Sequence, residues 1–129
     1  MSKRVLLADD HAERAEPVRE ALVTAGYTVV PAATWAECFQ AADEELPDLI
    51  VLDAQMPVLD GLATLRILRE YPDTKALPII MLSDSSGELE TRRAWAAAAD
   101  MYLTRPVSPL AVVAAANWLL RCSSRWPSG

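Results

Sequence analysis

The chain has 129 residues, 52% of them hydrophobic and 23% charged, as expected for one soluble globular domain with a proper core. Its formal net charge of -6 argues against nucleic acid or membrane partners, because binding to phosphate groups depends on clustered lysine and arginine. No apolar run is long enough for a membrane span or a signal peptide, so we expect a cytoplasmic protein.

Short apolar runs alternate with segments of helical periodicity, which is typical of βαβ units around a parallel sheet. We predict strands over residues 3–9, 27–31, 48–53, 77–83 and 101–104. We predict helices over residues 11–25, 35–45, 62–71, 88–98 and 109–121. Such units wind into a doubly wound α/β fold, with ligands expected beyond the carboxyl ends of the strands.

Cap residues support these bounds. Gly26 suits a left-handed helix end, Thr34 suits an N-cap, and Ser108 precedes a first-turn proline. We assign residues 1–122 to the domain and residues 123–129 to a flexible C-terminal tail or the start of a linker. A start at Met1, just before the first strand, suggests a free-standing or N-terminal module.

Carboxylates gather at the ends of two predicted strands. Asp9 and Asp10 follow the first strand, and Asp53 closes the third. These side chains should meet at one edge of the sheet, where like charges about 4 Å apart repel by roughly 4 kcal/mol per pair. Each aspartate alone is explained as a cap of the following helix, but three at one edge favour a divalent cation.

Further motifs follow in order along the chain. Residues 56–61 read Met-Pro-Val-Leu-Asp-Gly, Ser83 ends the fourth strand, and residues 104–106 read Thr-Arg-Pro. With the acidic residues, these motifs resemble the receiver domains of bacterial two-component response regulators. The resemblance covers residues 3–121. It implies a chemotaxis-regulator-like, flavodoxin-like sandwich of βα units with parallel strands in order 2-1-3-4-5.

The resemblance implies that Asp53 accepts a phosphoryl group from a histidine kinase or a phosphotransfer protein. A carboxylate is a competent nucleophile toward phosphorus. Mg²⁺ would be held by Asp9, Asp10, Asp53 and the backbone carbonyl of Gln55, because this ion prefers oxygen ligands. We therefore expect a phosphoacceptor that takes part in its own phosphorylation and dephosphorylation, and not an enzyme.

Three more residues match functional positions of the family. Ser83 corresponds to the hydroxyl that hydrogen-bonds the phosphoryl group, and Arg105 to the basic residue that contacts it. Tyr102 corresponds to the aromatic residue that turns inward on activation. A plain turn serine and a packed strand aromatic are the structural alternatives for Ser83 and Tyr102. His11, the single histidine, is expected at the surface.

Three positions depart from the family pattern. Arg105 stands where lysine is usual, and its planar fork is expected to clamp Asp53 or Asp9 before phosphorylation. Asp84 adds negative charge where a small residue is usual, and Ala98 replaces a glycine. These departures leave open a second hypothesis, in which an atypical receiver binds its partner without being phosphorylated.

Two other protein classes fit less well. A phosphatase of the haloacid dehalogenase type needs a second acidic residue two positions after the nucleophile, where this chain has Gln55. A flavodoxin-like carrier of FMN needs a first loop that cradles phosphate, whereas residues 9–11 would repel it. Cys38 and Cys122 are interpreted as small hydrophobic residues.

The last predicted helix is unusually apolar, with large side chains such as Trp118 spread over an arc of about 220°. With Trp95, this surface is a candidate for association, unless loops or a tail with Trp126 cover it. In the family, the corresponding face of residues 88–98, 101–104 and 109–121 mediates contacts. We predict that it forms a homodimer or docks a downstream effector or a fused output domain.

Overall fold

The computed structural model describes residues 2–54, 56, 61–84, 89, 93 and 99–125. These residues form the predicted doubly wound α/β fold, with a parallel five-stranded sheet in order β2-β1-β3-β4-β5. The strands are β1 (Arg4–Ala8), β2 (Thr28–Ala32), β3 (Leu49–Asp53), β4 (Ile79–Ser83) and β5 (Met101–Thr104). The helices are α1 (Ala12–Thr24), α2 (Trp35–Glu45), α3 (Gly61–Glu70) and α5 (Pro109–Arg125).

The predicted bounds differ from the observed ones mainly at two places. β4 begins at Ile79 rather than at residue 77, because Pro78 has no N–H to donate to a strand ladder. α5 continues to Arg125, beyond the predicted end at residue 121, since no proline interrupts the segment before residue 127. The first residues of the predicted tail are therefore helical. The predicted helix over 88–98 lies outside the described residues, except for Leu89 and Arg93.

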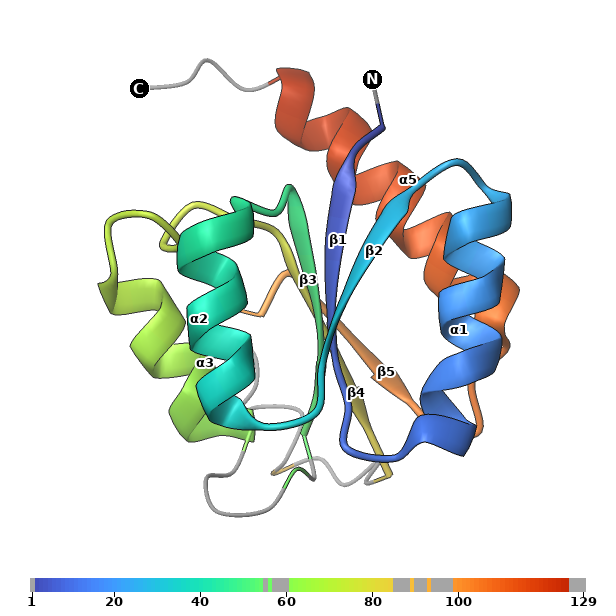
Figure 1. Ribbon diagram of the computed structural model, residues 1–129, viewed down its shortest axis with the longest axis horizontal. Helices are drawn as coiled ribbons and strands as arrows, with labels where there is room; N and C mark the ends of the chain where they lie inside the picture. Colours follow the sequence, from blue (N-terminus) through green and yellow to red (C-terminus); the bar gives the residue numbers. More distant parts are fainter. Residues whose placement is uncertain are drawn as a thin grey trace.

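The sheet lies between two helical layers. Figure 1 shows α1 and α5 on one face, and α2 and α3 on the other. β3 and β4 are buried throughout, and β1 is buried from Val5 onward, as is typical of strands in a parallel sheet that is covered on both faces. Fully buried side chains such as Leu6 and Ile50 each contribute about 1.5–3 kcal/mol of hydrophobic free energy.

Local signals in the sequence account for the helix ends. The Thr34 hydroxyl accepts a 3.1 Å hydrogen bond from the backbone N–H of Glu37, which caps α2. Gly26 has a φ of 101°, a backbone conformation that residues other than glycine rarely adopt, and it turns the chain after α1. The Ser108 hydroxyl accepts a 3.2 Å hydrogen bond from the N–H of Leu110 at the start of α5. These predicted caps are confirmed.

No helix among the described residues has the length and apolar character needed to cross a bilayer.

Candidate functional site

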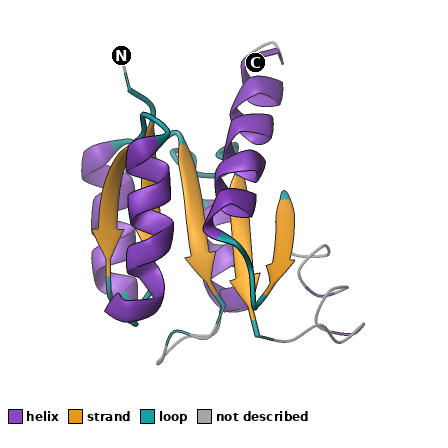
Figure 2. Ribbon diagram, turned by 90° about the vertical axis from the view of Figure 1, so that its right-hand side faces the viewer, coloured by secondary structure: helices purple, strands orange, loops and turns teal. Residues whose placement is uncertain are grey.

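The strand register brings the acidic residues together. Figure 2 shows the arrowheads of the strands at one edge of the sheet. Ala8 of β1 pairs with Leu52 of β3, so Asp9 follows β1 at the level where Asp53 ends β3. Asp9 and Asp53 are both buried, with side chains only 4% and 1% exposed. Buried carboxylates are costly unless they are paired, so their partners decide the character of the site.

Arg14, in the first turn of α1, forms hydrogen bonds with both carboxylates. Its Nη2 donates to Oδ2 of Asp53 at 2.6 Å and to Oδ1 of Asp9 at 3.1 Å. Its Nε also donates to Oδ2 of Asp9 at 3.3 Å, which makes the contact with Asp9 bidentate. The hydrogen bond to Asp9, followed by the charges of Asp53 and Asp9, holds the pKa of Arg14 above its usual value, against the lowering effect of burial.

Arg105, directly after β5, contacts the same two carboxylates. Its Nη1 lies 3.3 Å from Oδ1 of Asp53, and its Nη2 lies 3.4 Å from Oδ2 of Asp9. The contacts predicted for a clamping arginine are therefore present, although each is longer than an ideal charged hydrogen bond. Its Nη1 is also 3.5 Å from Oδ1 of Asp84, whose side chain is 58% exposed. Asp84 thus sits at the rim and faces the arginine.

Asp10 and His11 complete the acidic edge on the solvent side. Oδ1 of Asp10 lies 3.2 Å from Nδ1 of His11 and 3.8 Å from Nη2 of Arg14. Ligand atoms of Asp9, Asp10 and His11 lie within 4.8 Å of one another, a spacing compatible with a bound metal ion. Asp9 also accepts a 2.9 Å hydrogen bond from the backbone N–H of His11, so it caps the start of α1 as well.

Of the remaining predicted residues, Ser83 lies at the same edge and Tyr102 lies further inside the sheet. Ser83 is buried at the end of β4, where its carbonyl accepts a 2.7 Å hydrogen bond from the N–H of Arg105. Tyr102 is half-buried in β5 and packs against the core beneath α2 and α3. Gln55 and Ala98 lie outside the described residues, as does most of the segment 56–61; within it, Met56 is buried in the core.

Arg14 is the site residue that sequence reasoning missed. The available signal was its spacing, because a residue four positions after Asp10 at the start of a helix lies on the same side as Asp10. This signal is weak, since such pairs are common on exposed helices. The long-range contact with Asp53 depends on how α1 packs against the sheet, which periodicity alone does not reveal.

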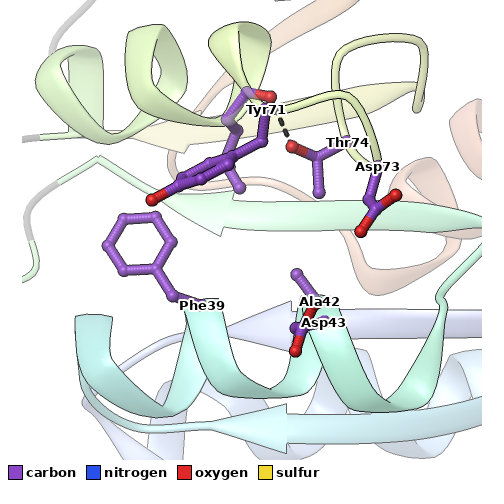
Figure 3. A pocket seen from close by; sticks show the side chains of 7 residues that line it. Phe39, Ala42, Asp43, Tyr71, Asp73 and Thr74 are labelled. Atoms are coloured by element: carbon purple, nitrogen blue, oxygen red, sulfur yellow. Dashed lines mark hydrogen bonds between the residues drawn. The ribbon is translucent and has the colours of Figure 1, made fainter.

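Another hollow, of about 200 Å³, lies away from the acidic edge, between α2 and the end of α3. Figure 3 shows the rings of Phe39 and Tyr71 close to each other at one end of it, with Thr74 to their right. The Thr74 hydroxyl donates a hydrogen bond to the carbonyl of Leu68 and so satisfies a backbone acceptor in the last turn of α3. This hollow brings none of the predicted site residues together.

The chain is similar to proteins of one family. The family model described as the response regulator receiver domain matches residues 5–117. The alkaline phosphatase synthesis transcriptional regulatory protein PhoP of Bacillus subtilis is 35% identical over 123 residues, which cover 95% of this chain and 50% of that protein. The transcriptional regulatory protein PrrA of Mycobacterium tuberculosis is 36% identical over 120 residues, which cover 93% of this chain and 51% of that protein. The chain thus spans about half the length of these curated relatives.

The fold is also similar to that of solved receiver structures. The chemotaxis response regulator CheY4 of Vibrio cholerae superposes with a TM-score of 0.86 at 27% identity. The match covers 92% of this chain and 99% of that one.

Proposed function

The chain belongs to the response regulator receiver domains of two-component systems, and on this basis we propose that Asp53 is its phosphoacceptor. The observation that supports this role most directly is the position of Asp53, a buried carboxylate at the carboxyl end of a central strand with basic groups on both of its oxygens. In the transfer, one oxygen of Asp53 forms a bond to phosphorus as the phosphorus–nitrogen bond of a phosphohistidine donor breaks. The donor would be a histidine kinase or a phosphotransfer protein.

The acidic edge has the donor chemistry of a Mg²⁺ site. Asp9, Asp10 and Asp53 surround one position. Nη2 of Arg14, which lies near all three carboxylates, marks this position. With the carbonyl of Gln55, they would provide the oxygen ligands of the ion. When bound, Mg²⁺ would neutralise the charge of the incoming phosphoryl group, which is the main requirement of phosphoryl transfer.

Residues of β4 and β5 would receive the transferred group. Ser83 and Arg105 lie at the ends of neighbouring strands, because Ser83 pairs with Thr104 in the sheet. A hydroxyl and a guanidinium at these positions can hydrogen-bond phosphoryl oxygens. Movement of Ser83 would be transmitted to Tyr102, which pairs with Met81 two residues further inside the sheet. Tyr102 is therefore our candidate for the switch residue.

The output of the switch would be a protein contact through the face of residues 88–98, β5 and α5. On the described part of this face, Leu110 and Trp118 are exposed, at 73% and 57%. Exposed apolar side chains of this size are common at interfaces. We propose homodimerisation, or docking of a downstream effector or a fused output domain, in a cytoplasmic protein that is a phosphoacceptor rather than an enzyme.

The phosphoacceptor role is tested by incubating the protein with acetyl phosphate and Mg²⁺ and measuring its intact mass. Wild type is expected to gain the mass of one phosphoryl group, and Asp53→Asn is expected to gain none. Asp73→Asn is the matched control, since Asp73 is exposed beyond α3 and should not affect the gain. No mass gain in wild type, or a gain that survives Asp53→Asn, would contradict the proposal; the first result would favour a receiver that signals without phosphorylation.

A further inference from the structure

One basic side chain lies where the proposed metal would bind. Nη2 of Arg14 is 2.6 Å from Oδ2 of Asp53, 3.1 Å from Oδ1 of Asp9 and 3.8 Å from Oδ1 of Asp10. A single nitrogen thus approaches all three carboxylates expected to hold a cation. Arg105, in contrast, lies at longer distances, with its nitrogens 3.3 Å from Oδ1 of Asp53 and 3.4 Å from Oδ2 of Asp9.

The guanidinium and a metal ion cannot share this position. Mg²⁺ binds its oxygen ligands at about 2.1 Å, so carboxylates that coordinate it leave no space between them for a planar nitrogen group. Electrostatic repulsion acts in the same direction, because the guanidinium keeps its positive charge at every physiological pH. Binding of the ion therefore requires Arg14 to leave.

The structure gives Arg14 a route out of the cluster. Its side chain is 28% exposed, although the carboxylates of Asp9 and Asp53 are almost wholly buried. It also borders a hollow of about 260 Å³ between α1 and the β5–α5 connection, lined by Asp9 and Arg105 at the cluster and by Pro106, Val107 and Pro109 beyond it. Rotation about the side-chain bonds of Arg14 would move its head group into this space or into solvent without displacing α1.

We propose that Arg14 is an internal counter-cation, which occupies the cation position among Asp9, Asp10 and Asp53 in the resting protein and is displaced when a divalent metal binds. The inference rests on the proposed function, which supplies the metal. Arg14 stabilises the metal-free cluster and so lowers its affinity for Mg²⁺. The concentration of Mg²⁺ needed for phosphorylation of Asp53 is raised accordingly.

The test is calorimetric titration of Mg²⁺ into the protein without a phosphodonor. Arg14→Met removes the charge and keeps a long apolar side chain; its Kd for Mg²⁺ is expected to be about tenfold lower than that of wild type, or lower still. Arg19→Met is the matched control, because Arg19 lies on the same helix, has a side chain that is 41% exposed and pairs with Glu16. It makes the same change in net charge and is expected to leave the Kd unchanged.

An unchanged or higher Kd in Arg14→Met would overturn the inference, and so would an equal decrease in both variants or the absence of metal binding in all of them. A second measurement uses the wild-type protein and does not depend on how a variant folds. The Nε–Hε signal of Arg14 is followed by NMR as Mg²⁺ is added. Its hydrogen exchange should become faster as Asp9 releases it, and a signal that stays protected at saturation would also overturn the inference.

These outcomes are distinct from failure of the proposed function. Tighter metal binding in Arg14→Met without phosphorylation of Asp53 would contradict the phosphoacceptor role and leave the counter-cation in place. Phosphorylation of Asp53 with no effect of Arg14→Met on the Kd for Mg²⁺ would contradict the counter-cation role of Arg14 and leave the phosphoacceptor role of Asp53 in place.

Discussion

Replacing Asp9 by alanine tests which electrostatic effect dominates the resting site. If repulsion among the three carboxylates dominates, removal of one charge should stabilise the protein. If the arginine contacts dominate, the same change should destabilise it. The contacts of Asp9 favour the second outcome, because its carboxylate accepts hydrogen bonds from the N–H of His11, from Nη2 and Nε of Arg14 and from Nη2 of Arg105.

The magnitude follows from these contacts. Attraction to two arginines and repulsion from two carboxylates are each about 4 kcal/mol per pair and largely cancel. The hydrogen bonds remain: about 1 kcal/mol for the cap of α1 and roughly 1.5–2 kcal/mol for the charged bidentate pair with Arg14, with little from the 3.4 Å contact of Arg105. We expect Asp9→Ala to lower the free energy of unfolding by about 2–3 kcal/mol, a large part of the stability of a small domain.

The assay is urea unfolding near neutral pH in the presence of a chelator, analysed as a two-state transition. Asp10→Ala is the control. It makes the same chemical change one residue away, but its carboxylate is 3.8 Å from Arg14, beyond hydrogen-bonding distance. We expect Asp10→Ala to have the stability of wild type or a slightly higher one. An Asp9→Ala variant as stable as wild type, or more stable, would refute this account of the site.

Two further predictions concern Arg105 and Cys38. Arg105→Lys should raise the rate of phosphorylation by acetyl phosphate by about 2- to 5-fold, because it removes long contacts worth about 0.5–1 kcal/mol from the resting carboxylates; an unchanged or lower rate would contradict the clamp. Burial raises the pKa of the Cys38 thiol to about 12, so ionisation favours the unfolded chain as the pH rises from about 8.5 toward that value. The stability advantage of wild type over Cys38→Ala, measured by urea unfolding, should therefore be complete at about pH 7 and smaller by roughly 2 kcal/mol at about pH 10, and a difference independent of pH would contradict the burial of this thiol.

Much of the fold was predictable because its signals are local. The apolar runs that become β1, β3 and β4 are buried on both faces, and the predicted strand order is the observed one. Thr34 caps a backbone N–H three residues away, and Gly26 acts through its own φ angle, so both roles can be predicted without the tertiary structure. The late end of α5 was not predicted, because the polar residues after residue 121 neither favour nor prevent a further turn of helix.

The candidate site also has one part that the sequence predicts and one part that depends on the tertiary structure. By itself, the sequence determined that Asp9, Asp10 and Asp53 share an edge with Ser83 and Arg105, because the carboxyl ends of parallel strands lie together whatever the side-chain details. Only the tertiary structure decided which cation those carboxylates hold. Arg14 and Asp53 are 39 positions apart, and their contact depends on the packing of α1 against the sheet and on the side-chain conformation that this packing allows. A cluster that the sequence presents as an acidic site awaiting a metal is, in the structure, already paired with two arginines.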